Sequence, residues 1–204
     1  MRVAPFPLSS VRILVRLVLW FWFIAALVVG RLELLARLPA PGTQVILFAL
    51  AALLLAAYFG IPAVRAWAEA LDLRGLVLLH LTRFVGIYFL ILYRRGELPY
   101  AFAVPGGWTD IIVASLALGV ILLPLRQELR RQAFLIWNTI ALVDLLIVAA
   151  TAARIERSQP WQLEPFQHLP LSMLPTFLVP LLIATHAVIY ARLLRRPRET
   201  ANPA

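Results

Sequence analysis

Long apolar stretches alternate with short polar segments along the chain, and six of these stretches approach the length of a bilayer-spanning helix. Such a helix needs about 20 mostly apolar residues. Arginine, proline or glycine bounds each stretch, as is typical of the ends of membrane spans. Because an isolated strand cannot satisfy its backbone hydrogen bonds in lipid, the pattern predicts helices. The predicted spans are residues 12–30, 43–64, 73–93, 109–125, 133–153 and 174–194.

Composition supports the membrane interpretation. Of the 204 residues, 62% are hydrophobic and 14% are charged, and the mean hydropathy is +0.87. Soluble domains carry roughly 45–50% apolar and about 25% charged residues. A water-soluble fold of this size could not bury so much apolar surface. We therefore predict an all-α, polytopic membrane helical bundle that forms a single integral membrane domain over residues 1–204.

Arginine is the only cationic residue apart from histidine. The chain has 19 basic and 10 acidic residues, a net charge of +9 and no cysteine, and none of the basic residues is lysine. A lysine Schiff base, disulfides, thiolate zinc sites and cysteine-ligated iron–sulfur clusters are therefore excluded. Because the arginines flank apolar stretches, the expected anionic partner is the lipid headgroup and not nucleic acid.

The distribution of arginines predicts the orientation. With six spans, twelve arginines fall on the side that holds both termini, and six fall on the other side. Cytoplasmic segments of membrane proteins carry the excess of Lys and Arg. Both termini are therefore expected in the cytoplasm, and the first span is expected to remain uncleaved, since Arg31 and Arg37 follow it.

A few polar side chains lie inside the predicted spans. These are His80 and Arg83 in the third, Asn138 and Asp144 in the fifth and His186 in the sixth. An ionisable group there costs about 2.5–3.5 kcal/mol on insertion scales, so it needs a partner or a function. With a rise of 1.5 Å per residue, Arg83 and Asp144 lie roughly 14 and 15 Å from the flanking arginines. Both reach the midplane, which predicts a salt bridge between them.

Three interpretations of this polar site remain open. Arg83 and Asp144 could simply lock two helices together. The site could bind a solute or form a proton path, since transporters use buried His, Arg and Asp in this way. Finally, His80 and His186 lie at matching depth on different helices, which suits bis-histidine ligation of haem b, with Arg83 facing a propionate. No metal site other than this haem iron is predicted.

Proline and aromatic residues fill the connection before the fourth predicted span. Gly106 and Gly107 predict a tight turn, and Thr109 or Asp110 is expected to cap the following helix. Trp108 is expected in the headgroup zone. An anion bound at the helix N-terminus is the alternative, but the charge of Asp110 argues against it.

The long connection between the fifth and sixth predicted spans, which is expected on the outer side, contains His168, four residues after Glu164. Two ligands without a third are common by chance, so an exposed loop histidine is favoured over a metal site. Pro175 and Pro180 enter the sixth span and are expected to kink it and free carbonyl groups towards the polar site. The chain contains no G-x-S-x-G, no H-E-x-x-H and no glycine-rich phosphate loop.

One further pattern is a set of spaced residues in the last four predicted spans and their connections: Arg83, Gly86, Phe89, Leu90, Leu98, Pro99, Phe102, Ala103, Pro105, Gly107, Asp110, Ile111, Trp137, Asn138, Asp144, Leu145, Pro175, Val179, Pro180 and His186. With this pattern the chain resembles a group of small, uncharacterised multi-pass bacterial membrane proteins. The similarity covers about the last 120 residues and leaves the first two spans unmatched. The resemblance implies a bacterial inner-membrane protein but supplies no activity.

The sequence thus predicts an inner-membrane protein that binds a small ligand or cofactor between the third, fifth and sixth helices. The residues expected at this site are His80, Arg83, Asn138, Asp144 and His186. A solute or proton transporter using Arg83 and Asp144, and a non-catalytic scaffold subunit of a larger complex, are the alternatives. The expected partners are the lipid bilayer and either other subunits of a membrane complex or further copies of the chain. Whether the protein is an enzyme stays open.

Overall fold

The computed structural model describes residues 8–124 and 126–194, and this part of the chain is helical with short connections and no strand. The predicted end of the fourth span, at residue 125, lies outside the described residues. So do Arg2, Arg195, Arg196 and Arg198, which contributed to the predicted orientation.

Six helices are long and apolar enough to cross a membrane. The third of them is a continuous helix built from α4, η2 and α5, and the last is built from η4 and α8. The elements are α1 (Leu8–Arg31), η1 (Leu34–Arg37), α2 (Gly42–Gly60), α3 (Pro62–Glu69), α4 (Leu73–Leu78), η2 (Leu79–Val85), α5 (Gly86–Arg94), α6 (Tyr100–Leu122), α7 (Gln127–Ser158), η3 (Pro160–Gln167), η4 (Leu174–Leu178) and α8 (Val179–Leu194).

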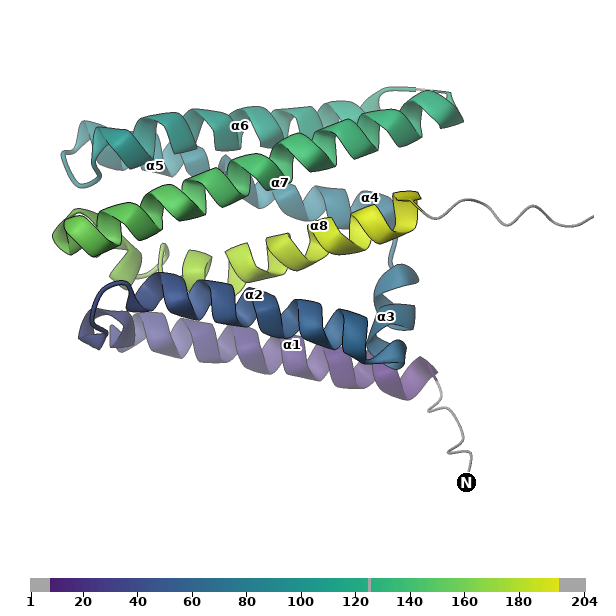
Figure 1. Ribbon diagram of the computed structural model, residues 1–204, viewed down its shortest axis with the longest axis horizontal. Coiled ribbons are helices and arrows are strands. Elements are labelled where there is room, and N and C mark those ends of the chain that lie inside the picture. The colour runs from purple at the N-terminus through teal and green to yellow at the C-terminus, as the bar shows by residue number, and fades with distance from the viewer. Residues whose placement is uncertain (1–7, 125, 195–204) are drawn as a thin grey trace, which may run out of the picture.

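The long helices run back and forth in one bundle, so both ends of the described chain lie at the same end of it (Figure 1). Helix α6 packs against α5, η2 and α7, while α8 packs against α7 and α2. Helix α1 touches the rest through α3, η1 and η4. The centre of the bundle is therefore formed by η2, α5, α6, α7 and α8, which carry most of the predicted polar residues.

Several predicted span boundaries differ from the structure. Helix α2 ends at Gly60, not at residue 64, because Pro62 has no N–H to continue it and begins α3 instead. Helix α7 is longer than predicted, since it includes polar turns at both ends and covers Gln127–Ser158. The third and sixth helices, Leu73–Arg94 and Leu174–Leu194, lie within one residue of the predicted ranges.

The largest correction concerns the fourth helix, which begins at Tyr100 and not near residue 109. Gly106 and Gly107 do not form a turn; they lie inside α6. A Cβ atom on Gly107 would lie 2.8 Å from the carbonyl oxygen of Gly86. The glycines thus permit close contact between two helix backbones, as small residues do in membrane helix packing. Trp108 and Asp110 consequently lie on the helix and not in a loop, with Trp108 exposed and Asp110 buried.

Helix α2 is capped by a side chain from another helix. Its N-cap residue, Pro41, offers no side-chain hydrogen bond. Instead, the buried Glu156 of α7 accepts hydrogen bonds from the N–H groups of Thr43 (3.0 Å) and Gln44 (3.2 Å). The first N–H groups of a helix have no intrahelical partner, and a carboxylate there also complements the helix dipole. This contact fixes the start of α2 against the end of α7.

Proline disturbs the sixth predicted span, as the sequence predicts, but the freed carbonyl faces another part of the molecule than predicted. Leu174–Leu178 forms a π-helical turn before the α-helix. In an α-helix the Thr176 carbonyl would accept from residue 180, but Pro180 has no N–H. The indole Nε1 of Trp22 donates to this carbonyl at 2.9 Å. The sequence predicts that carbonyl groups freed by the prolines face the polar site. The Thr176 carbonyl instead faces α1.

Candidate functional site

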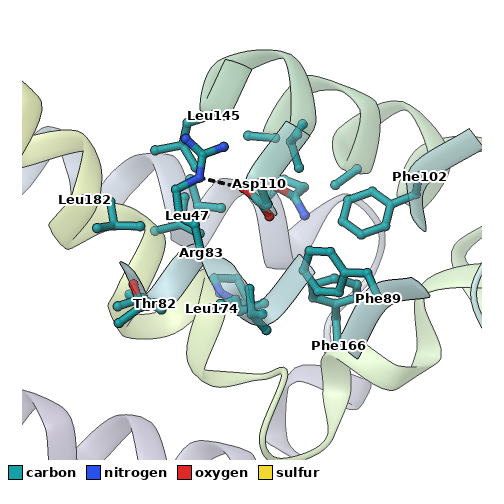
Figure 2. Close-up of a pocket in the computed structure, with 18 residues that line it drawn as sticks. Leu47, Thr82, Arg83, Phe89, Phe102, Asp110, Leu145, Phe166, Leu174 and Leu182 are labelled. Atoms are coloured by element: carbon teal, nitrogen blue, oxygen red, sulfur yellow. Dashed lines mark hydrogen bonds and ion pairs between the residues drawn. The ribbon is translucent and has the colours of Figure 1, made fainter. Parts of the chain in front are cut away.

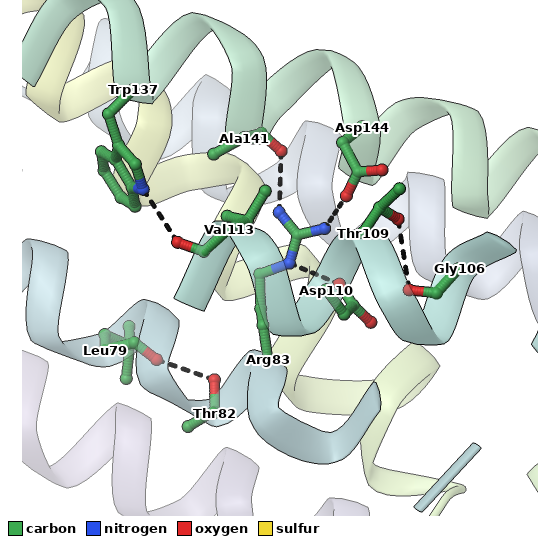
Figure 3. Close-up of polar contacts among 10 residues, drawn as sticks. All are labelled: Leu79, Thr82, Arg83, Gly106, Thr109, Asp110, Val113, Trp137, Ala141 and Asp144. Carbon is green, nitrogen blue, oxygen red and sulfur yellow. Dashed lines mark hydrogen bonds and ion pairs between the residues drawn. The ribbon is translucent and has the colours of Figure 1, made fainter. Parts of the chain in front are cut away.

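The arginine predicted at the midplane is buried and bound on three sides (Figure 3). Its Nε donates to Asp110 Oδ1 of α6 at 2.5 Å. Its Nη1 donates to the backbone carbonyl of Ala141 at 2.9 Å, and its Nη2 donates to Asp144 Oδ2, both on α7. Arg83 itself is carried by η2. Three helices of the bundle thus meet at one guanidinium group, and we call Arg83, Asp110 and Asp144 the arginine cluster.

The arginine cluster is unbalanced in charge. One guanidinium faces two carboxylates, so the three side chains sum to one negative charge when all are ionised. The side chains of Asp110 and Asp144 are 7% and 14% exposed, and that of Arg83 is 2% exposed. Within the described residues no further ion pair involves any of the three. The excess charge therefore lies in an interior with few groups to offset it.

Two glycines position the cluster. Gly86 lies three residues after Arg83, and Gly107 lies three residues before Asp110, so each glycine is one helical turn from its charged neighbour. A Cβ on Gly86 would overlap the carbonyl oxygen of Gly107 and lie 2.9 Å from the Cβ of Asp110. The helix containing Arg83 and α6 therefore cross at backbone contact, which brings Asp110 within reach of Arg83.

The predicted salt bridge between Arg83 and Asp144 is confirmed. The second partner, Asp110, is not predicted from the sequence, which places this residue at the start of the fourth helix and not opposite Arg83. A signal for it was present in the sequence, because R-x-x-G at 83–86 and G-x-x-D at 107–110 are mirror images across two antiparallel helices. Reading Gly107 as a packing residue would have placed Asp110 opposite Arg83.

The two histidines predicted at matching depth lie against each other. The ring centres of His80 and His186 are 4.4 Å apart, and neither residue is exposed. His80 Nε2 lies 3.1 Å from Thr185 Oγ1, and His186 Nδ1 lies 2.8 Å from Asn138 Oδ1. The remaining ring nitrogens, His80 Nδ1 and His186 Nε2, are buried without a hydrogen-bond partner. The edge of Trp137 packs on this pair, with its ring centre 5.0 Å from that of His80.

This geometry does not fit haem b. Metal–imidazole bonds are about 2.0–2.1 Å long, so two histidines on opposite sides of one iron would hold their ring centres about 6 Å apart. The observed ring centres are closer than that, at 4.4 Å, with the ring planes tilted by 50° to each other, which leaves no room for a macrocycle between them. Among the residues that the structure describes, no group of three or more His, Cys, Asp or Glu side chains could hold a metal ion.

A small internal cavity adjoins the arginine cluster (Figure 2). Its volume is about 60 Å³. Arg83 and Asp110 line it together with Phe89, Phe102 and, from α2, Gln44. The Oε1 atom of Gln44 is buried without a hydrogen-bond partner. Binding sites for drug-sized molecules and cofactors enclose about 300–1,000 Å³, whereas a water occupies about 30 Å³. The cavity therefore suits a few water molecules and not a cofactor.

The other predicted positions lie apart from this cluster. His168 follows η3, with Nδ1 3.3 Å from Glu33 Oε1 and Nε2 3.9 Å from Glu164 Oε1. Its side chain is 41% exposed. Trp108 is exposed on α6 and, by its position, faces away from the bundle centre. Neither contributes to the arginine cluster.

Comparison with protein families gives one match. A family described as a domain of unknown function (DUF8737) matches residues 40–194. The chain belongs to this family. The DUF8737 region contains α2 through α8, hence the whole arginine cluster, the histidine pair and the cavity. It also includes the second span, which the resemblance noted from the sequence had left unmatched. No protein with a curated description and no solved structure matches the chain.

Proposed function

We propose that the protein is an integral membrane protein of the bacterial inner membrane that moves protons across the bilayer through the arginine cluster. The observation that carries this proposal is the charge of the cluster, which has two buried carboxylates for one guanidinium. With a proton on either carboxyl group the cluster is neutral, and without it the cluster carries one negative charge.

The second carboxylate is what separates this proposal from a purely structural lock. A helix-to-helix lock needs one carboxylate for Arg83, and such a pair is neutral. Asp110 and Asp144 both bind the guanidinium, from different helices. An uncompensated charge at membrane depth costs several kcal/mol, so this arrangement favours uptake of a proton. The same excess of charge favours a carrier over a scaffold subunit, whose function would not require it.

The surroundings of Asp110 support exchange of that proton. Oδ1 receives the Arg83 hydrogen bond, and Oδ2 receives none from the described residues. The residue also lines the cavity beside the cluster. A cavity of about 60 Å³ has room for roughly two waters at about 30 Å³ each. Water in this cavity would lie between the carboxyl group and Gln44, which also lines the cavity and whose Oε1 has no hydrogen-bond partner.

The test is proton flux in proteoliposomes loaded with a pH-sensitive dye, in which a potassium gradient and valinomycin impose a membrane potential. Wild-type protein should change the internal pH faster than protein-free vesicles do. Asp110→Asn and Asp144→Asn should each abolish this flux, because either variant leaves a neutral pair that has no proton to exchange.

The matched control is Glu97→Gln, which removes an exposed carboxylate in the connection after α5 and should leave the flux unchanged. Flux equal to that of empty vesicles for the wild-type protein, or undiminished flux in both aspartate variants, would contradict the proposal. Circular dichroism and size-exclusion profiles matching those of the wild type establish that the variants are folded.

A further inference from the structure

A large, open pocket lies at the end of the bundle where α7 begins and α8 ends. Its volume is about 680 Å³. Four arginines line it: Arg126, Arg130 and Arg131 at the start of α7, and Arg192 near the end of α8. Glu128 is the acidic residue among the lining side chains. The lining therefore carries three net positive charges, far from the arginine cluster in the bundle centre.

Two of the four arginines are held in place by the backbone. Arg131 Nε donates to the carbonyl of Leu193 at 2.8 Å, and Arg192 Nη1 donates to the carbonyl of Leu71. A guanidinium has five N–H donors, so each of these side chains keeps further donors for a ligand. The side chains of Arg126 and Arg130 make no hydrogen bond or ion pair to the described residues. The pocket thus combines two fixed and two unengaged guanidinium groups.

We infer that this pocket binds the phosphate group of an anionic phospholipid. Guanidinium groups bind phosphate oxygens through paired N–H donors, and basic pockets between membrane helices are typical sites for anionic headgroups. The start of α7 adds a helix N-terminus, whose N-cap residue supplies no side-chain cap. This inference rests on membrane insertion, which is part of the proposed function, but not on proton movement. It concerns the binding of an anion at a separate site.

The apolar neighbourhood identifies the ligand as a lipid and not free phosphate. Leu73, Phe134 and Leu193 line the pocket beside the arginines. Leu129 and Leu194, at the same ends of α7 and α8, are more than half exposed. Acyl chains would cover this apolar surface while the headgroup phosphate meets the arginines. Inorganic phosphate would use only the charged part of the site.

The experiment is native mass spectrometry of the full chain in a neutral detergent. The protein is titrated separately with a phosphatidylglycerol, with a phosphatidylcholine of the same acyl chains, and with sodium phosphate. Phosphatidylglycerol should bind with one tight site. Arg126→Gln/Arg130→Gln should weaken that site by about tenfold or more, since each arginine near an anionic lipid contributes about one factor of five.

The control variant is Arg94→Gln/Arg95→Gln, which removes two exposed arginines at the other end of the bundle and should leave the binding unchanged. Arg126→Gln alone should give an intermediate loss. Equal binding of phosphatidylcholine and phosphatidylglycerol, equal loss in the control variant, or displacement of the lipid by stoichiometric sodium phosphate would overturn the assignment. Unchanged proton flux in the Arg126→Gln/Arg130→Gln variant separates this site from the arginine cluster.

Discussion

Arg83 is the only cation of the arginine cluster, so the cost of a substitution in the cluster depends on whether it removes this cation or one of the two carboxylates. The three ionised side chains of the cluster sum to one negative charge, so removing the guanidinium leaves two buried carboxylates without a cation. Removing one carboxyl group instead leaves a neutral pair. Breaking a buried ion pair typically costs about 3–5 kcal/mol, because the remaining charge loses its partner. The effect of a substitution should therefore depend on which charge it removes.

Arg83→Gln is expected to lower the free energy of unfolding by about 3 kcal/mol or more. Asp144→Asn should lower it by less than half as much, because Asp110 still balances Arg83. The measurement is unfolding by sodium dodecyl sulfate followed by circular dichroism. The control is Arg154→Gln, at an exposed position near the end of α7. Equal destabilisation by Arg83→Gln and Asp144→Asn would contradict the charge argument.

The depth of a residue along its helix was enough to predict the contact between Arg83 and Asp144 but not the contact between Arg83 and Asp110. Counting from the flanking arginines placed Arg83 and Asp144 at the same level, and the structure pairs them. Asp110 could not be found in this way, since it follows Pro105, Gly106 and Gly107, which predict a turn in a soluble protein. Equal depth also predicts that the two histidines lie near each other, but depth does not give the distance between their rings, and the observed distance of 4.4 Å does not fit haem b.

At the scale of helices, backbone contact between α6 and the start of α5 positions the residues of the arginine cluster. Glycine within a helix normally destabilises it by roughly 0.5–1 kcal/mol relative to alanine. Gly86 and Gly107 lie where two helix backbones touch, whereas Gly119 of α6 has nothing within 4 Å of an added Cβ. A glycine-to-alanine substitution should therefore lower the stability at a helix contact such as Gly86 and raise it at an open position such as Gly119.

Gly86→Ala should lower the melting temperature and reduce the stability by about 1–3 kcal/mol, the usual effect of overpacking. The added methyl group would meet the Gly107 carbonyl, which is backbone and cannot rotate away. Gly119→Ala should raise the stability by about 0.5–1 kcal/mol, since it only improves helix propensity. Thermal unfolding in detergent measures both. A stable Gly86→Ala variant with unchanged melting temperature would show that the helices do not cross at these glycines.

The first helix should depend on one indole hydrogen bond. Trp22→Phe removes the donor to the Thr176 carbonyl but keeps an aromatic ring beside Phe177. Loss of a side-chain hydrogen bond typically costs about 0.5–1.5 kcal/mol. The control is Trp20→Phe on the same helix, where the indole is 64% exposed. We expect the Trp22 variant, and not the Trp20 variant, to increase proteolysis in the connection after α1. Equal proteolysis of the two would contradict this role.

Helix existence was predictable from the sequence, because apolar stretches of about 20 residues admit few other structures in lipid. Helix ends were predictable where arginine follows the apolar stretch, as at the end of α5, whereas the end of α2 was predicted too late although Pro62 marks it. They were wrong where proline and glycine served packing, as at the start of α6. The extent of α7 was also missed, because its polar ends continue the helix beyond the apolar stretch.

At the scale of the whole molecule, six passes return both ends of the described chain to one end of the bundle (Figure 1). The arginine-lined pocket between α7 and α8 lies at that same end. The arginine bias of the sequence predicts that this end faces the cytoplasm. The lipid site and the orientation are thus linked, since the cytoplasmic leaflet carries the more negative surface potential.

Reporter fusions test the orientation. Green fluorescent protein at the C-terminus should fluoresce, and alkaline phosphatase at the same position should be inactive, because both termini are expected in the cytoplasm. Alkaline phosphatase inserted after Gly96 should be active, since the connection between α5 and α6 is expected outside. Gly96 suits the insertion because it has φ +75° and open space around it. Activity at the C-terminus together with inactivity at Gly96 would reverse the orientation and place the arginine-lined pocket on the outer face. Activity at both positions would contradict an even number of crossings between the predicted cytoplasmic N-terminus and the C-terminus, and with it the interpretation of all six helices as membrane spans.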